Sequence, residues 1–159
     1  MERKIEMKLQ LLAPWLILLA SFGAAFGQDD DAKKDLAKMQ GNWQLVHGAG
    51  DGETASEYVI RNFKCVFKGD RLTFDGIAPL TNRAGRLTVK LDTSTTPRCI
   101  DLKVETGSLK GDILEGAYEW KGDELKLCVY LGKGNRPLDF EAKAGSDRVL
   151  FVLKKAEPP

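Results

Sequence analysis

The sequence contains a single histidine, three cysteines without short paired spacing, and almost no excess of charge of either sign. Because His47 is the one histidine, any Ser-His-Asp or Cys-His pair has to include it, and a zinc site lacks the usual second imidazole. Cys65, Cys99 and Cys128 form no Cys-Xaa-Xaa-Cys pair, which disfavours a structural zinc site. His47 ends a predicted strand, so we expect it at an edge or rim, and we expect no cofactor.

The small net charge excludes one large class of partner. The whole chain has a formal net charge of +1, from 24 basic and 23 acidic side chains. Residues 1–27 carry three of the basic and two of the acidic side chains, so the chain without them is formally neutral. Nucleic-acid binding needs a basic stripe that neutralises phosphates, and the interspersed charges provide none. We therefore expect no nucleic-acid partner.

The beginning of the chain has the pattern of a secretory signal peptide. A short charged stretch precedes an apolar run at Leu11–Phe22, and small residues follow the run. The run is shorter than the roughly 20 apolar residues that cross a bilayer. We predict a signal peptide at residues 1–27, cleaved after Gly27 with Ala25 two residues before it; an uncleaved anchor helix is the alternative. Cleavage implies an exported protein, periplasmic or extracellular, with no stable membrane span.

The remainder of the chain is patterned as β-strands. Apolar and polar residues alternate at 86–91 and 100–105, which is typical of strands with one buried and one exposed face. The motif Lys-Gly-Asp-Xaa-Leu begins at Lys68, Lys110 and Lys121, and Gly-Asp between apolar runs indicates tight hairpin turns. We predict an all-β fold: a single antiparallel meander of eight to nine strands that closes into a barrel, with a sandwich as the alternative.

Two segments predict short helices instead. Residues 31–40 begin with an aspartate cap and are followed by Gly41, which favours a helix end. Residues 53–62, between the first two strands, offer Thr54 or Ser56 as a cap. The predicted organisation is a signal peptide at 1–27, a short helical segment at 28–40, a barrel domain at 41–155 and a tail at 156–159.

The triplet Gly41-Asn42-Trp43, before the first predicted strand, is similar to the Gly-Xaa-Trp opening of lipocalin barrels. Together with further segments, it resembles an uncharacterised lipocalin-like domain family that occurs in many paralogous copies in planctomycete bacteria. The resemblance implies a lipocalin-like barrel and an exported setting, but no reaction, ligand or catalytic residue. It extends from about Leu36 to Lys154, through the segments 39–43, 67–70, 90–92, 97–102, 116–119, 122–128 and 136–140.

The cysteines differ in how they fit this family. Cys65 and Cys99 depart from its pattern, whereas Cys128 fits it. Because an exported setting permits disulfides, the resemblance favours a bridge between Cys65 and Cys99, with Cys128 as a buried thiol. Buried free thiols are the alternative.

The interior of the predicted barrel is the first candidate for a binding site. An eight-stranded barrel is either filled by side chains or just wide enough for one small ligand. The lipocalin resemblance implies that Trp43 closes one end and that residues 53–62 form a loop or lid over the other. The candidate ligand-binding residues, in the interior and the lid, are Trp43, Leu45, Tyr58 and Val89.

A strand at 114–120 places Glu115, Ala117 and Glu119 on one face, opposite its aromatic residues. Two carboxylates on one face are able to divide general acid and general base roles. If the aromatic face lines the barrel, however, the glutamates face water, and we expect this second arrangement.

Three functions are compatible with these patterns. We expect first a monomeric, non-enzymatic binding module that holds a small apolar ligand. The first alternative is a protein-interaction or inhibitor domain with a packed core, which binds an envelope protein through the loops 48–62 and 132–137. The second of these loops is a predicted long turn at 132–135, and we expect another strand after Pro137. The second alternative is an enzyme on this barrel.

Overall fold

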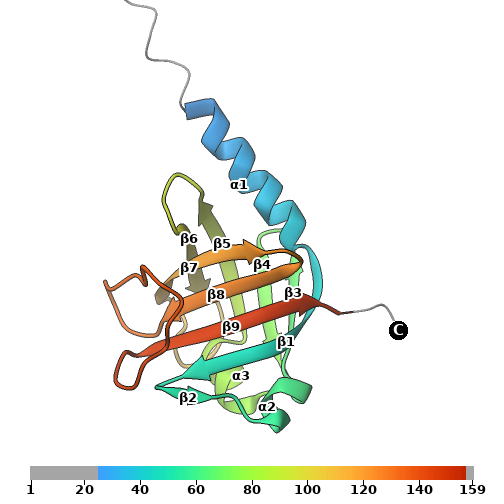
Figure 1. Cartoon of the computed structure of the whole chain (residues 1–159), viewed down its shortest axis with the longest axis vertical. Helices are drawn as coiled ribbons and strands as arrows, with labels where there is room; N and C mark the ends of the chain where they lie inside the picture. The colour runs from blue at the N-terminus through green and yellow to red at the C-terminus, as the bar shows by residue number, and fades with distance from the viewer. Residues whose placement is uncertain (1–24, 157–159) are drawn as a thin grey trace, which may run out of the picture.

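Nine antiparallel strands form one sheet that closes on itself in the computed structural model, which describes residues 25–156 (Figure 1). In chain order the elements are α1 (Ala25–Met39), β1 (Gly41–Gly50), β2 (Glu53–Thr54), α2 (Glu57–Asn62), β3 (Lys64–Lys68), β4 (Arg71–Asp75), α3 (Ala78–Ala84), β5 (Arg86–Asp92), β6 (Arg98–Val104), β7 (Ile113–Lys121), β8 (Glu124–Tyr130) and β9 (Arg148–Lys155). Helices lie at both ends of this barrel, the long α1 at one end and the short α2 and α3 at the other.

The predicted meander is confirmed. Each strand from β3 to β9 pairs with its neighbour in the chain, and β9 pairs back onto β1. Eight strands therefore close the barrel, and β2 is an extra strand on β1. Closure gives nearly every strand two partners, so the alternating sequence has one face in the barrel and one face outside.

Two of the three Gly-Asp motifs form the expected tight turns. The β3–β4 and β7–β8 hairpins each turn through two residues, with Gly69 at φ +62° and Gly122 at φ +63°. Glycine adopts these positive φ angles without a steric penalty. The third motif, which begins at Lys110, lies in the longer connection between β6 and β7, where Ser108 N–H donates to the Asn82 carbonyl in α3. A contact distant in sequence therefore replaces the short turn there.

The inward-facing side chains fill the barrel. The largest fully buried ones come from the strands, from α1 and from residue 63: Met39, Trp43, Phe63, Phe67, Leu72, Leu87, Ile100, Leu102, Tyr118, Leu125, Leu127 and Leu153. Leucine and aromatic side chains dominate this set, as expected for the interior of a small barrel.

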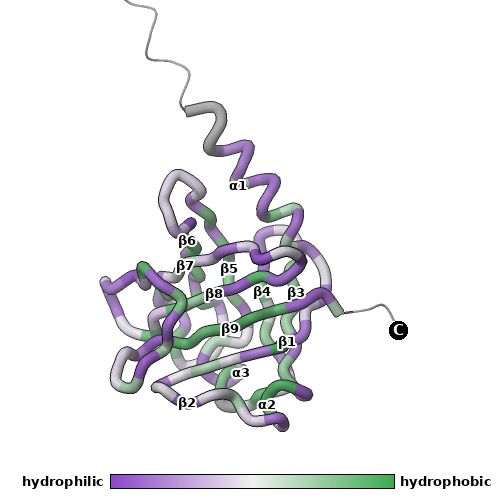
Figure 2. Tube along the Cα trace, viewed as in Figure 1, coloured by the Kyte–Doolittle hydropathy of each residue, from purple (hydrophilic) through white to green (hydrophobic). Residues whose placement is uncertain are grey.

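The carboxyl end of α1 packs against one end of the barrel. Trp43 Nε1 donates to the Met39 carbonyl over 2.6 Å, and the Gln40 side-chain amide bonds to both backbone groups of Gly69. The helix begins at Ala25, six residues before the predicted start at Asp31. Figure 2 shows that the part of α1 that extends beyond the barrel is mostly hydrophilic. Most of the predicted signal peptide, residues 1–24, lies outside the described residues, so the signal peptide remains a prediction.

Three features differ from the sequence-based expectation. The helix α3 was not predicted. The predicted helix at 53–62 is present only as α2 at Glu57–Asn62, capped by Ser56, because Glu53–Thr54 form the strand β2. No strand follows Pro137 directly, because residues 131–147, which we call the strap, have no regular secondary structure, and the next strand is β9. The strap lies on the outer face of β6, β7 and β8, because Arg136 bonds to carbonyls of β6 and β7 and the Cys128 thiol contacts the Glu141 carbonyl.

The strap also corrects the prediction for the outer face of β7. Ala117 is 0% exposed, and Glu115 and Glu119 are half-buried rather than facing water. Each glutamate has a cationic partner, Arg136 for Glu115 and Lys126 for Glu119. The alternation of apolar and polar residues identified the inward face of β7 correctly. It could not show that the strap covers the outward face, because such a cover adds no periodic pattern to the sequence.

Candidate functional site

Helix α3 packs into the end of the barrel beside α2, and we call this end the mouth (Figure 1). Pro79 lies in the first turn of the helix, where proline favours the helical φ and lacks only an N–H that has no helical partner. Leu80 packs against the core and Ala84 is buried. The other end of α3 is fixed to the β6–β7 connection, because Leu109 N–H donates to the Arg83 carbonyl over 3.0 Å.

A crevice of about 440 Å³ opens between α2, α3 and the strands β1 and β9; we call it the mouth crevice. Its polar side chains, Glu53, Thr54 and Ser56, lie on the β2 and α2 side. This volume falls within the range of roughly 300–1,000 Å³ that is usual for small-molecule sites. Its apolar walls include Leu45, Val59, Phe63, Ile77, Leu80 and Phe151.

A second, smaller cavity of about 40 Å³ lies inside the barrel on the other side of Leu80; we call it the inner cavity. Arg83 is the one charged residue that lines it, and the other lining residues are apolar. The two spaces share Leu80, Val149 and Phe151. A cavity of this size with apolar walls stays dry and accepts little more than a methyl group unless those side chains move.

The four predicted ligand-binding residues do not form one site. Leu45 lines the mouth crevice. Trp43 is buried at the opposite end of the barrel, beneath α1, and Val89 is buried in the core. Tyr58 lies on α2, as expected for a lid residue, but it is 70% exposed and turned away from the crevice, which Val59 lines instead.

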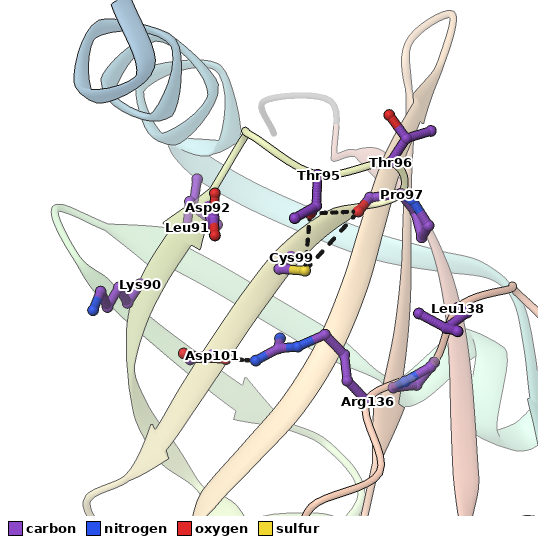
Figure 3. A pocket seen from close by; sticks show the side chains of 11 residues that line it. Lys90, Leu91, Asp92, Thr95, Thr96, Pro97, Cys99, Asp101, Arg136 and Leu138 are labelled. Carbon is purple, nitrogen blue, oxygen red and sulfur yellow. Dashed lines mark hydrogen bonds and ion pairs between the residues drawn. The ribbon is translucent and has the colours of Figure 1, made fainter. Parts of the chain in front are cut away.

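A cleft of about 420 Å³ lies outside the barrel, between β5, β6 and the strap; we call it the outer cleft. Figure 3 shows Cys99 between Thr95 on one side and Arg136 on the other, with Leu138 at the strap side. The Thr95 hydroxyl lies 3.1 Å from Cys99 Sγ. A shallower hollow of about 650 Å³ adjoins it beyond Pro97.

Arg136 uses its charge within the protein. One guanidinium nitrogen, Nη1, donates to the carbonyls of Ile100 and Gly116, at 3.2 and 2.9 Å. The other, Nη2, pairs with Asp101 at 2.6 Å and with Glu115 at 3.3 Å. Burial acts to lower the pKa of Arg136, but the hydrogen bond and charge of Asp101 outweigh it and raise the pKa. This arginine therefore holds the strap on the sheet.

The residues considered for catalysis do not converge. His47 is exposed on β1, and β8 and β9 separate that strand from β7, which carries Glu115 and Glu119. No three metal-ligating side chains gather in the part of the chain that the structure describes.

The three cysteines are free thiols. The disulfide that the resemblance favoured is absent, because Cys65 is buried among inward-facing residues of β3 whereas Cys99 belongs to the outward-facing row of β6. Burial raises the pKa of Cys65 to about 12 and that of Cys128 to about 11. Neither buried thiol is a nucleophile near neutral pH.

No protein-family model, curated protein or solved structure matches this chain. Within residues 25–156, no helix is long and apolar enough to span a membrane. The candidate site therefore rests on geometry alone.

Sequence reasoning missed α3 and the residues it brings to the mouth. The signal was present: Pro79 marks a helix start, Leu80 and Ala84 are four residues apart, and Gly85 follows as a stop. Arg136 carried no comparable signal, because its four acceptors lie at least 20 residues away in the chain.

Proposed function

We propose that the protein is an exported, non-enzymatic binding module of lipocalin-like architecture that holds a small apolar ligand at the mouth of its barrel. The observation that carries this proposal is the mouth crevice, whose walls are largely apolar and whose volume is about 440 Å³. The mouths of β-barrels are a frequent place for small-molecule sites. The ligand lies at the mouth rather than deep in the interior, which the side chains fill.

Neighbouring residues on α2 provide a matched test. Val59 lines the crevice and Tyr58 does not. We expect Val59→Trp to fill the crevice and to abolish binding of decanoate and decan-1-ol, measured by methyl NMR titration, whereas Tyr58→Trp leaves both affinities unchanged. Native mass spectrometry of protein purified from its own host identifies a resident ligand. Wild-type protein that binds neither probe and carries no small molecule contradicts the proposal.

A second candidate function is recognition of an envelope protein through the outer cleft. Leu138 favours it, because this apolar side chain is 77% exposed beside the cleft. The buried core of a protein interface is apolar and depleted of charged residues, so Leu138→Glu is expected to abolish capture of a specific envelope partner. Equal capture by the wild type and the variant argues against this function.

A further inference from the structure

Two charged residues line the apolar cavities of the mouth: Glu53 lines the mouth crevice and Arg83 lines the inner cavity. Arg83 belongs to the last turn of α3, and its side chain is exposed while also lining the inner cavity. The helix fixes its backbone, since the Arg83 carbonyl accepts from Leu109 N–H over 3.0 Å. The stem of an arginine commonly covers apolar surface while its head stays in water.

This guanidinium group has no hydrogen bond or ion pair with any residue in the range 25–156. Four other arginines, namely Arg61, Arg98, Arg136 and Arg148, each pair with a carboxylate. Arg71 and Arg86 also lack such a partner, but they line neither the inner cavity nor the mouth crevice. Arg83 therefore combines an available cation with an adjoining apolar space.

Taking the proposed function as given, we infer that the ligand of the mouth is a free single-chain amphiphile with a carboxylate head, and that Arg83 binds this head. A guanidinium group matches a carboxylate through two parallel hydrogen bonds. One cation balances one negative charge, which favours a carboxylate over a phosphate monoester that carries nearly two at neutral pH. The alkyl chain lies in the inner cavity and the mouth crevice.

The charges around the site also fix the direction of the ligand. Glu53 lies on the far rim of the mouth crevice, on β2, and repels an anionic head placed there. The head therefore lies at Arg83, and the chain runs past Leu80 toward α2. Because Leu80, Val149 and Phe151 separate the two spaces, their side chains change rotamer when the chain binds.

The test compares Arg83→Gln with Arg86→Gln, a matched control on β5 that leaves both spaces untouched. Binding of decanoate and of decan-1-ol to the full chain is measured by methyl NMR titration, and thermal unfolding verifies that each variant is folded. We expect the wild type and Arg86→Gln to bind decanoate about tenfold more tightly than decan-1-ol, because only the carboxylate forms the charge-assisted pair with Arg83. We expect Arg83→Gln to lose this preference and to keep its affinity for decan-1-ol.

The outcomes separate this inference from the proposed function. If the wild type binds both probes equally and Val59→Trp abolishes both, the binding function stands and the role of Arg83 is wrong. If the wild type binds neither probe, the inference is wrong, and if it also carries no small molecule in native mass spectrometry, the proposed function is wrong too. A membrane surface is the alternative partner of Arg83. If the wild type sediments with phosphatidylglycerol vesicles, Arg83→Gln does not, and the wild type shows no preference for decanoate, the inference is overturned in favour of a membrane surface.

Discussion

The hydroxyl group of Tyr118, on β7, donates a hydrogen bond of 2.7 Å to the carboxylate of Asp35, on α1. Arg98 pairs with the same carboxylate from β6, so a buried aspartate joins the helix to two strands of the barrel. Asp35 is the one charged residue among the buried residues that the structure describes. A buried carboxylate is tolerated only when hydrogen bonds and an opposite charge compensate it, and these two partners supply both.

The first prediction concerns this bond. Tyr118→Phe removes one partner from a carboxylate that cannot reach water freely, so we expect the free energy of unfolding to fall by about 1–2 kcal/mol. Tyr58→Phe, at an exposed position, is the control and is expected to change it by less than about 0.5 kcal/mol. Urea denaturation measures both. Equal changes in the two variants contradict a stabilising role for the bond.

Two glycines separate backbone strain from steric exclusion. Gly69 and Gly76 both have positive φ, at +62° and +86°. A Cβ atom at Gly69 meets nothing within 4 Å, whereas one at Gly76 overlaps the carbonyl group of Asn62. Gly76 also lies in the short connection between β4 and α3, the helix that packs at the mouth.

We therefore predict unequal effects of the same substitution. Gly69→Ala carries only the cost of a left-handed backbone, about 1–2 kcal/mol. Gly76→Ala adds a clash with a backbone atom, and we expect a loss of more than about 4 kcal/mol or no stable fold. Thermal unfolding followed by circular dichroism compares them. A Gly76→Ala protein as stable as Gly69→Ala contradicts the close approach.

The elements that were predictable from the sequence are those whose signals are local. Alternation at 86–91 and 100–104 identified β5 and β6, since burial on one face of a strand imposes a period of two. Gly69 and Gly122 identified two hairpins, and Ser56 identified the cap of α2, because turn and cap chemistry involves residues only a few positions apart.

The elements that were not predictable depend on contacts between distant parts of the chain. The strap has no period because Arg136, rather than a hydrogen-bonded ladder, holds it on β6 and β7. The same cover buries Ala117, which alternation alone places in water. For the candidate site, Leu45 was found through its strand, whereas Arg83 was missed together with α3, although Pro79 and Gly85 mark the ends of that helix.

The third prediction tests the attachment of the strap. Arg136→Met leaves the carboxylates of Asp101 and Glu115 without this cation and removes one donor from each of two backbone carbonyls, so we expect a loss of about 2 kcal/mol. We also expect faster hydrogen exchange at Gly52, whose N–H donates to the Ala142 carbonyl in the strap. Lys133→Met, which removes an exposed ion pair from the same segment, is the control. Exchange at Gly52 that is the same in both variants shows that Arg136 does not hold the strap.

The fourth prediction concerns the three thiols. Cys99 lines the outer cleft, whereas Cys65 and Cys128 are buried with raised pKa values of about 12 and 11. Because the thiolate is the reactive form, we expect a disulfide reagent at pH about 8 to modify one thiol per native chain and all three after unfolding in guanidinium chloride. Cys99→Ser is expected to abolish the native reaction. Reaction of the native variant shows that Cys65 or Cys128 is accessible.

The last prediction follows from burial of Cys65, which raises the pKa of this thiol from its ordinary value of 9.0 to about 12 in the folded protein. Above pH 9 the folded state therefore keeps a proton that the unfolded state releases. The contribution of the protonated Cys65 thiol to the free energy of unfolding is therefore fully present below pH 9 and decreases as the pH rises toward about 12. We expect Cys65→Ala to be less stable than the wild type at pH 7, because it leaves a small cavity, and to lose less stability than the wild type between pH 8 and 11. Urea denaturation across this range measures both slopes, and parallel slopes would show that the Cys65 thiol does not titrate on unfolding.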